Sequence, residues 1–323
     1  MGHFILRRIF WAVFLFFTAT LVTYLIFFVI PSNPAKLIAG RNADSQDVAR
    51  VAGFYHLNVS VWQQYWIFLW NILSHGSLGN SYIGHQSVRW LIEQEAPVTA
   101  SLVFGGAIFW LSLSIPIGIL SALRPRSLMD RASMIFVLVG ISAHPVWIGL
   151  ILSYLVGYKL GITPIAGYCN FFTGNISAEC SGPVQWAYHL ILPWITFMVL
   201  FAALYVRLIR ANVMETMSED YVRTARAKGA GERRVMIHHV LRNSMLPVVT
   251  ILGMDIGLAL GGALFTESIF NLPGLGAQIL RSYTVFDLPV IAGVICFATM
   301  AVIVFNFIVD ITYGFLDPRI RVT

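Results

Sequence analysis

Six long apolar runs constrain this chain more than any other feature of its sequence. Five of them contain no Asp, Glu, Lys or Arg, and the fifth run contains one acidic residue. A helix needs about 20 apolar residues to cross about 30 Å of hydrocarbon. Because lipid offers the backbone no hydrogen-bond partner, each run must form a helix. We therefore expect an all-α membrane protein with six transmembrane helices, at Ile9–Ile30, Val98–Leu123, Ala132–Tyr158, Trp186–Val206, Met245–Thr266 and Leu288–Val309.

The composition excludes a soluble globular domain. Of the 323 residues, 58% are hydrophobic and only 11% are charged, whereas a soluble domain carries about a quarter charged residues. The net charge of +6 comes from cations at the ends of the apolar runs. This pattern is typical of a membrane surface, and it argues against a nucleic-acid partner.

The first apolar run resembles a signal peptide but is too long for one. It is uncharged over 22 residues, from Ile9 to Ile30, whereas the apolar part of a signal peptide has about 7–15 residues. Bulky Val29 and Ile30 close the run in place of a small-residue cleavage site. We expect an uncleaved first span.

The distribution of Lys and Arg predicts the orientation. With the N-terminus inside, 15 of the 21 basic residues fall on inner segments and 6 on outer segments. Cytoplasmic loops carry the excess of Lys and Arg, so we expect both termini in the cytoplasm. The chain then divides into the N-terminal tail and first span (1–30), an extracytoplasmic loop with short helices (31–97), and a five-span core (98–323). The core includes a cytoplasmic segment, residues 209–244.

The first outer loop contains an aromatic, amphipathic stretch, Val61–Trp70. Trp and Tyr rings settle at membrane interfaces, so this stretch suits the outer membrane surface. Packing on the chain's own helices is equally compatible with the sequence, and both interpretations stay open.

The cysteines predict a disulfide but no metal site. Cys169 and Cys180 share the second outer loop, where a pair of thiols can oxidise, and we expect them to be bonded. Cys296 lies in the last span and suits the core. No Cys and His spacing is typical of zinc.

The sequence offers no site for nucleotide hydrolysis. A P-loop needs Gly-Lys-Ser/Thr after a glycine-rich turn, and the three lysines, Lys36, Lys159 and Lys228, each follow Ala or Tyr. We expect no cofactor in this chain.

The inner segment between the fourth and fifth runs has an ordered layout. Glu219 and Asp220 suit a helix N-terminus, where the helix dipole favours anions. Arg226 and Lys228 suit its C-terminus, and Gly229 suits the left-handed residue that ends it.

A second short helix is expected over about Glu232–Asn243. Small Ala225 and Ala227 let another protein approach the first helix closely. An ordinary positively charged loop would explain the arginines but not this order of cap, helix, glycine and helix.

This segment resembles the EAA loop of permeases in binding-protein-dependent ABC importers, in the variant of the oligopeptide, dipeptide and nickel group. Arg223-Thr224-Ala225, followed by three residues and Gly229, carries the resemblance. Further stretches match the same group and extend the resemblance over nearly the whole chain: Gly76-x-Leu78-Gly79-x-Ser81, Glu267–Gly276, Asp310–Tyr313 and Leu316–Arg321.

The resemblance implies a type I ABC importer permease in the cytoplasmic (inner) membrane of a prokaryote. It implies a second, homologous permease as partner in a heterodimer, two ATPase subunits that bind ATP and Mg, and an extracytoplasmic solute-binding protein. The residues implied to couple to the ATPases are Glu219, Asp220, Tyr221, Arg223, Thr224, Ala225, Arg226, Ala227, Lys228 and Gly229. The implied substrates are dipeptides or oligopeptides, with nickel or another small solute as the alternative.

In the resemblance the fifth span lines the translocation path. Gly253, Gly257 and Gly261 share one face at four-residue spacing, which allows close helix packing. Asp255 lies about 200° from Gly253 around the helix. An acid in a span costs about 2.5–3.5 kcal/mol unless it faces water or a partner.

We therefore expect a path face that carries Asp255, Ala259, Gly262 and Thr266, with a structural hydrogen bond from Asp255 to a neighbouring helix as the alternative. His144, beside Pro145 in the third span, is either a hydrogen-bonded kink residue or a substrate contact.

Two other classes of protein fit the sequence less well. A stand-alone secondary transporter tends to show internal repeats, and we find no convincing repeat between the two halves. An intramembrane enzyme needs paired polar groups at membrane depth, and one Asp and one His on different spans give it little support.

Overall fold

A computed structural model describes residues 2–26, 35–36, 44–54, 59–172 and 180–316. The described residues form helices joined by short turns, and extended segments pair only in two isolated bridges. The helices of the first half are α1 (Gly2–Tyr24), α3 (Ser45–Phe54), α4 (Val61–His75), α5 (Val88–Leu123), α6 (Leu128–Ser142), α7 (Pro145–Leu152) and the π-helix η2 (Ser153–Lys159). Those of the second half are α8 (Pro183–Met217), α9 (Asp220–Ala227), α10 (Glu232–Arg234), the π-helix η3 (Val235–Leu241), α11 (Arg242–Ser244), α12 (Leu246–Leu260), α13 (Leu264–Ile269), α14 (Leu275–Thr284) and α15 (Leu288–Leu316).

The described helices account for up to six membrane spans. Four are long and apolar enough to cross alone, at Leu6–Tyr24, Val88–Leu123, Pro183–Met217 and Leu288–Val309. Two bent pairs raise the number to as many as six. The prediction of an all-α membrane protein is confirmed.

Two runs that we predicted as single spans are broken. The third run divides into α6 and α7–η2, which are bent by 101°. His144 has extended backbone dihedrals there, because a residue before proline is disfavoured in the helical region. In the fifth run, α12 ends at Leu260 and α13 begins at Leu264.

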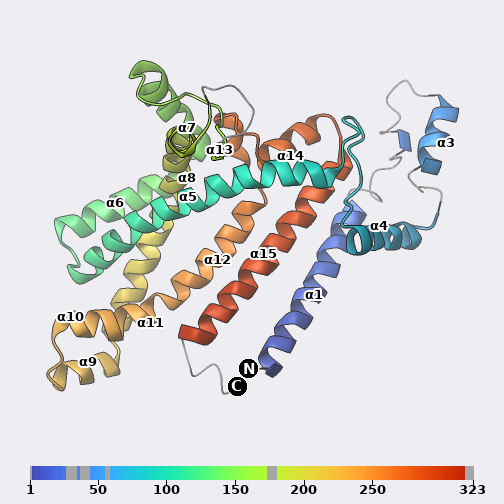
Figure 1. Cartoon of the computed structure of the whole chain (residues 1–323). Helices are drawn as coiled ribbons and strands as arrows, with labels where there is room; N and C mark the ends of the chain where they lie inside the picture. The colour runs from blue at the N-terminus through green and yellow to red at the C-terminus, as the bar shows by residue number, and fades with distance from the viewer. Residues whose placement is uncertain (1, 27–34, 37–43, 55–58, 173–179, 317–323) are drawn as a thin grey trace.

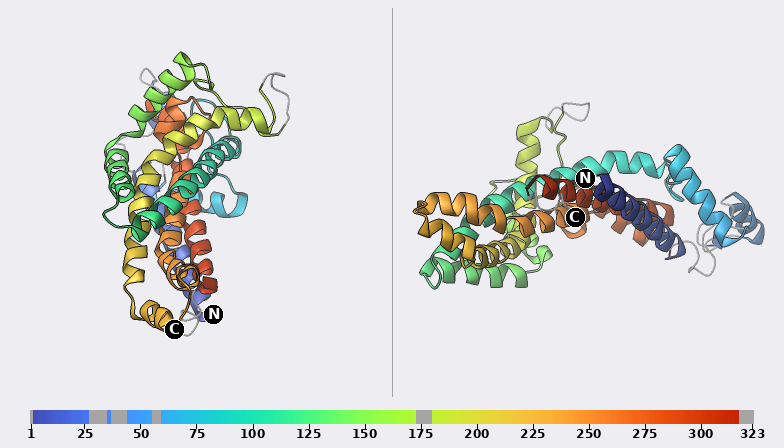
Figure 2. Two further views of the ribbon diagram at one scale, coloured as in Figure 1. Left: turned by 90° about the vertical axis from the view of Figure 1, so that its left-hand side faces the viewer. Right: turned by 90° about the horizontal axis from the view of Figure 1, so that it is seen from below.

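Several elements predicted to be cytoplasmic lie together. The start of α1, the helices α9 and α10, and the end of α15 share the lower end of the molecule in Figure 1. The left view of Figure 2 shows α8 running down to α9 and α10 at this end. Arg7, Arg8 and the arginines of α9–α11 therefore lie at one end, the one that the charge distribution assigns to the cytoplasm.

The core lies between α5 and α8. Trp110 of α5 is fully buried and stacks on Phe201 of α8, with ring centroids 4.7 Å apart. Gly106 and Gly118 of α5 let the helices approach closely, because a Cβ at either position would collide with Phe197 or Ile209 of α8. Glycines thus fix which face of α5 meets α8.

Candidate functional site

The cytoplasmic connection from α8 to α12 forms what we call the coupling segment, residues 219–244. Its first helix, α9, begins after Glu219 in extended conformation and ends at Gly229, whose φ is +81°. The Ala230 N–H donates to the Ala225 carbonyl and the Gly229 N–H to the Arg226 carbonyl. This pair of bonds is the Schellman end of a helix, and it needs a residue that tolerates a positive φ.

Most of the predicted coupling residues are exposed. Of the ten, Ala225 and Arg226 are partly buried, and the others are exposed: Glu219, Asp220, Tyr221, Arg223, Thr224, Ala227, Lys228 and Gly229. The residue that anchors α9 is Val222, which is fully buried and which sequence reasoning did not single out. The segment thus presents polar and basic side chains outward from one apolar contact.

The second half of the segment holds α9 in a fixed position. Val235 and Val240 of η3 are fully buried in the same apolar cluster as Val222. The Asn243 side-chain amide donates to the Tyr221 hydroxyl at 2.8 Å. The expected second helix, Glu232–Asn243, is present as α10, η3 and α11.

A buried ionic clamp lies just above this segment. Arg210 of α8 donates from Nε and Nη2 to the two carboxylate oxygens of Asp130, at 2.6 and 3.0 Å. The Asp130 carboxylate also accepts hydrogen bonds from the Ser121 hydroxyl and the Arg126 N–H. The clamp ties α5, α6 and α8 together.

Sequence reasoning counted Arg210 only as a positive charge and did not consider Asp130. The available signal was the spacing Ser127-x-x-Asp130, since a cap residue followed by an acid three positions later marks a helix start. Ser127 does cap α6, by accepting from the Asp130 N–H.

The predicted path face of α12 is largely closed by the chain itself. The Asp255 carboxylate accepts a hydrogen bond from the Tyr205 hydroxyl of α8 at 2.8 Å. Ala259 and Thr266 are buried, and Gly262 is partly buried. Because α12 stops at Leu260, Gly262 and Thr266 do not continue its face. The geometry of Asp255 matches the alternative interpretation, a structural bond to a neighbouring helix.

A different face of α12 is open. Ile251, Met254 and Leu258 are 37%, 51% and 72% exposed. Their spacing of three and four residues places them on one side of the helix. This apolar face is only partly covered by the described chain, and Met254 also borders a cavity next to α1.

The glycines of α12 pack against α15. A Cβ on Gly253, Gly257 or Gly261 would collide with Val309, Val302 or Ala298. The three positions therefore face α15, and their four-residue spacing allows the close helix packing that we predicted.

His144 begins α7. Its Nδ1 accepts from the Val146 N–H at 3.3 Å, and its ring meets the edge of Phe265, with centroids 5.0 Å apart. The side chain is exposed. It lies at the bend between α6 and α7, as the kink interpretation expected.

The stretch Glu267–Gly276 belongs to a compact outer turn, residues 261–277. Glu267 is fully buried. Its Oε1 accepts from the Thr99 hydroxyl at 2.8 Å and from the Ala263 N–H at 3.3 Å, and its Oε2 accepts from the Ala277 N–H at 2.9 Å. One carboxylate thus joins α5, the start of α13 and the start of α14.

Glycines make this turn possible. Gly262 has a φ of +128°, and a Cβ there would collide with the backbone of Gly276. A Cβ on Gly274 would meet the Glu267 carboxylate. The motif contributes to the family resemblance, but the sequence does not indicate that Glu267 is buried and joins three helices.

The Gly76-x-Leu78-Gly79-x-Ser81 stretch is fastened to the start of α15. Buried Asp287 accepts hydrogen bonds from the Ser81 hydroxyl and, at 3.0 Å, from the Tyr82 N–H. This stretch therefore meets the start of α15, although 206 residues separate Ser81 from Asp287.

The two outer cysteines lie together with a histidine. Cys169 and Cys180 form a disulfide, with Cα atoms 5.1 Å apart, and His189 Nδ1 lies 3.2 Å from Cys169 Sγ. These three residues are the described group whose spacing could hold a metal ion, although the bonded sulfurs are not free to act as thiolate ligands. Cys296 is free and buried.

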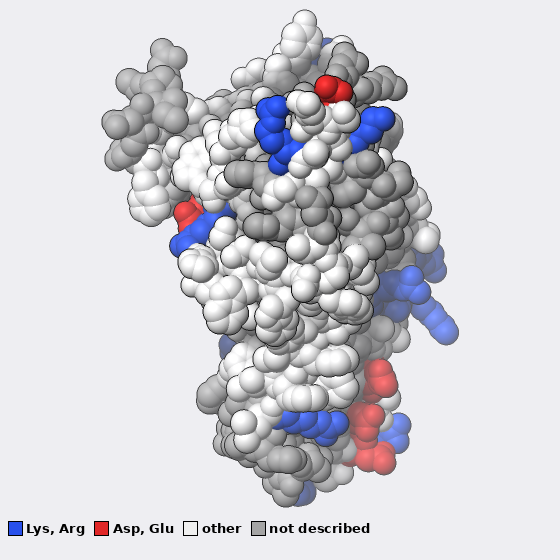
Figure 3. Space-filling model, turned by 90° about the vertical axis from the view of Figure 1, so that its right-hand side faces the viewer, with Lys and Arg blue, Asp and Glu red and all other residues white. Residues whose placement is uncertain are grey.

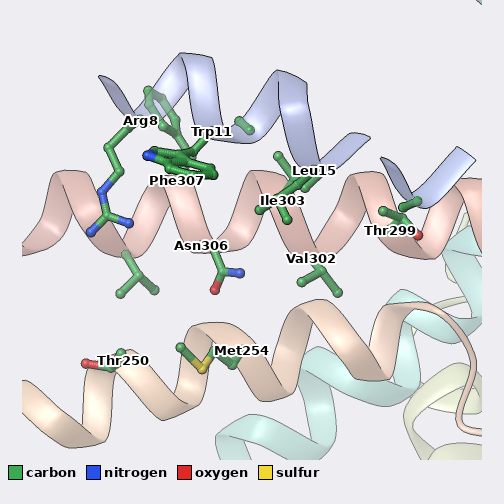
Figure 4. A pocket seen from close by; sticks show the side chains of 13 residues that line it. Arg8, Trp11, Leu15, Thr250, Met254, Thr299, Val302, Ile303, Asn306 and Phe307 are labelled. Carbon is green, nitrogen blue, oxygen red and sulfur yellow. The ribbon is translucent and has the colours of Figure 1, made fainter. Parts of the chain in front are cut away.

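A cavity of about 420 Å³ is lined by residues of α1, α12 and α15. Figure 4 shows Arg8 and Trp11 of α1 on one side, Asn306 and Phe307 of α15 beside them, and Met254 of α12 opposite. Of the described residues that line it, none belongs to the predicted path face. The cavity lies beside the open face of α12.

Two family models match the chain. The model described as the binding-protein-dependent transport system inner membrane component matches residues 114–322. A second, described as the N-terminal part of the same membrane component, matches residues 1–103. The chain belongs to this family of transport-system inner membrane components. The predicted resemblance and the inner-membrane location are confirmed.

Curated relatives match over almost the whole length. The dipeptide transport system permease protein DppB of Escherichia coli (strain K12) is 36% identical over 338 residues, covering 99% of each chain. The di/tripeptide transport system permease protein DppB of Pseudomonas aeruginosa (strain UCBPP-PA14) is 35% identical over 335 residues, again covering 99% of each. The DppB protein of Alkalihalophilus pseudofirmus is 34% identical over 315 residues and covers 94% of each.

Proposed function

We propose that this protein is the permease subunit of an ATP-driven importer of dipeptides and other short peptides. The observation that carries the proposal is the end-to-end similarity to dipeptide and di/tripeptide permeases. The exposed coupling segment supports it, since a transport subunit that takes its energy from a partner must present a contact surface to that partner.

We infer that ATPase subunits, which bind ATP and Mg, dock on α9. The helix is short and anchored through Val222, and it projects exposed Asp220, Arg223 and Lys228 at the cytoplasmic end. A rigid anchor lets a displacement of α9 pass to α8, and the Asp130–Arg210 clamp then passes it to α6 and α5. The chain itself supplies no step of hydrolysis in this mechanism.

The open face of α12 is where we place the second permease and the path. Ile251, Met254 and Leu258 would otherwise remain uncovered inside the membrane. We propose a heterodimer with a homologous permease across this face, and an extracytoplasmic binding protein that delivers the peptide near the outer turn. Asp255, held by Tyr205, then positions α12 against α8 rather than meeting a peptide amine.

Uptake measured in a reconstituted complex tests this function. The chain would be affinity-purified from cells that express its neighbouring transport subunits, and the complex placed in proteoliposomes with ATP inside. We expect ATPase subunits to co-purify, and labelled dipeptide to accumulate only with ATP and binding protein present. Accumulation of nickel or another small solute in place of dipeptide would refute the substrate, and uptake without any ATPase subunit would refute the mechanism.

A further inference from the structure

Helix α4 of the first outer loop has one face that packs against the chain. Tyr65 and Leu69 are 9% and 2% exposed and cluster with Phe16 and Tyr24 of α1. The Tyr24 hydroxyl donates to Gln64 Oε1 at 2.8 Å, and the hydroxyls of Thr20 and Tyr65 lie 3.2 Å apart. These contacts fix how α4 is rotated about its own axis.

Beside the packed face, α4 presents a ridge of tryptophans. Trp62, Trp66 and Trp70 are 69%, 63% and 59% exposed, and Leu73 on the same side is 60% exposed. At about 100° per residue these four positions fall within an arc of about 80°. The large side chains thus form one continuous strip, which we call the tryptophan ridge.

The third side of α4 is uncharged and mostly polar, with Ile67, which is 38% exposed, among its polar residues. Gln63, Asn71, Ser74 and His75 follow the ridge around the helix, and Val61–His75 contains no Asp, Glu, Lys or Arg. An apolar strip next to a polar arc is the pattern of a helix that lies in the plane of a membrane surface.

The position of α4 matches this pattern. In Figure 1, α4 runs across α1 near the end of α1 that lies away from the N-terminus. On this face of the molecule, the visible Lys, Arg, Asp and Glu lie toward the two ends and along the edges, and much of the described surface between them is uncharged (Figure 3). Helix α1 also exposes large aromatic side chains, those of Phe10, Trp11 and Phe14. Helix α4 therefore lies near the end of α1 that the charge distribution assigns to the outer side.

We propose that the tryptophan ridge docks into the outer leaflet of the membrane, at the level where lipid headgroups meet acyl chains. Indole rings favour this level because they combine a large apolar surface with an N–H that needs a partner. The polar arc then faces the water outside. The bound helix would hold α1, through Tyr65 and Gln64, and the outer loop in a fixed position at the membrane surface. This inference does not depend on the transported solute.

Lipid-borne quenchers test the docking in the complete complex. Single cysteines at Trp66 and, as the control on the polar arc, at Asn71 would be introduced beside Cys296→Ser, leaving the Cys169–Cys180 disulfide intact. Each would be labelled with bimane, and the complex placed in nanodiscs that contain lipids with a nitroxide on the upper acyl chain. We expect quenching at position 66 to exceed quenching at position 71 by at least threefold.

Equal, weak quenching at both positions would overturn the proposal, and so would protection of position 66 together with its cross-linking to another subunit. If Trp66→Cys does not insert, the variant with Trp62, Trp66 and Trp70 all replaced by Phe gives a second measurement. Lipids brominated on the upper acyl chain should quench the tryptophan emission of the unchanged protein more strongly than that of this variant. Identical fractional quenching would contradict docking.

Discussion

The outer turn and the coupling segment are both short polar structures at the ends of α12, but they satisfy their charges in opposite ways. Glu267 in the outer turn is fully buried, and three donors of the same chain meet its carboxylate. In the coupling segment the charged side chains form loose surface pairs, such as Asp220 with Arg223 at 3.5 Å, with side chains 96% and 70% exposed.

This difference shows at which end the chain provides partners for its own charged groups. A buried carboxylate without donors is costly, so the outer turn must form as a unit with α5 and α14. Exposed charges cost little to leave unpaired, so the coupling segment can present them to another protein. We expect substitutions at the outer turn to damage the fold, and substitutions at the coupling segment to damage energy transfer.

The largest loss of stability is expected for Glu267→Ala. It leaves the Thr99 hydroxyl and the N–H groups of Ala263 and Ala277 without their acceptor, at a cost of about 3–5 kcal/mol in total. Thermal unfolding of the purified permease in detergent measures this loss. Glu267→Gln is the matched control, because its Oε1 can still accept the hydrogen bonds from the Thr99 hydroxyl and the Ala263 N–H. We expect this variant to lose about 1–2 kcal/mol of stability. A stable, transport-competent Glu267→Ala protein would remove the contrast between the two ends.

The Asp130–Arg210 clamp comes next. Asp130→Ala leaves Arg210, whose side chain is 23% exposed, beside donors only, and we expect a loss of about 1–3 kcal/mol in thermal unfolding. The charge-swapped pair Asp130→Arg with Arg210→Asp should not restore stability. The reason is that the Ser121 hydroxyl and the Arg126 N–H both donate into the Asp130 position. Recovery in the swapped protein would show that charge attraction alone matters there.

Gly229→Glu sharpens the comparison at the other end. A Cβ at Gly229 meets nothing within 4 Å, but the φ of +81° strains any side chain by about 1–2 kcal/mol. Gly229→Gln carries the same strain without the charge. We expect both proteins to insert normally, with ATP-driven uptake reduced at least tenfold further in Gly229→Glu than in Gly229→Gln. Equal uptake coupled to hydrolysis in the two variants would contradict docking of an ATPase at this turn.

The smallest effect is expected for the surface pair of Arg226 and Glu232. Their side chains are 35% and 72% exposed, with Nε and Oε1 2.9 Å apart. Glu232→Gln should cost less than about 1 kcal/mol, and added salt should shrink the difference further because solvent screens exposed charges. A loss above about 2 kcal/mol, unaffected by salt, would mean that the coupling segment is as self-contained as the outer turn.

Local rules predicted the ends of α9 well. Glu219 and Asp220 at its start, Arg226 in its last turn and Gly229 in a left-handed conformation all agree with the structure. Such ends depend only on residues within one turn. The same rules left two interpretations of Asp255 open, and the bond from Tyr205 agrees with the structural one. The periodicity of α12 places Asp255 on a different face from Gly253. Its partner, Tyr205, is determined by how α8 packs against α12.

The sequence by itself determined the membrane setting, the helical fold, the order of the spans and the family. Each of these follows from runs of apolar residues, from the distribution of Lys and Arg, or from motifs whose members are close in the chain. Only the tertiary structure decided which polar groups meet. Glu267 finds Thr99 across 168 residues, Asp130 finds Arg210 across 80, and Ser81 finds Asp287 across 206. Such pairs depend on which helix faces lie together in three dimensions, and no periodicity within one segment carries that information.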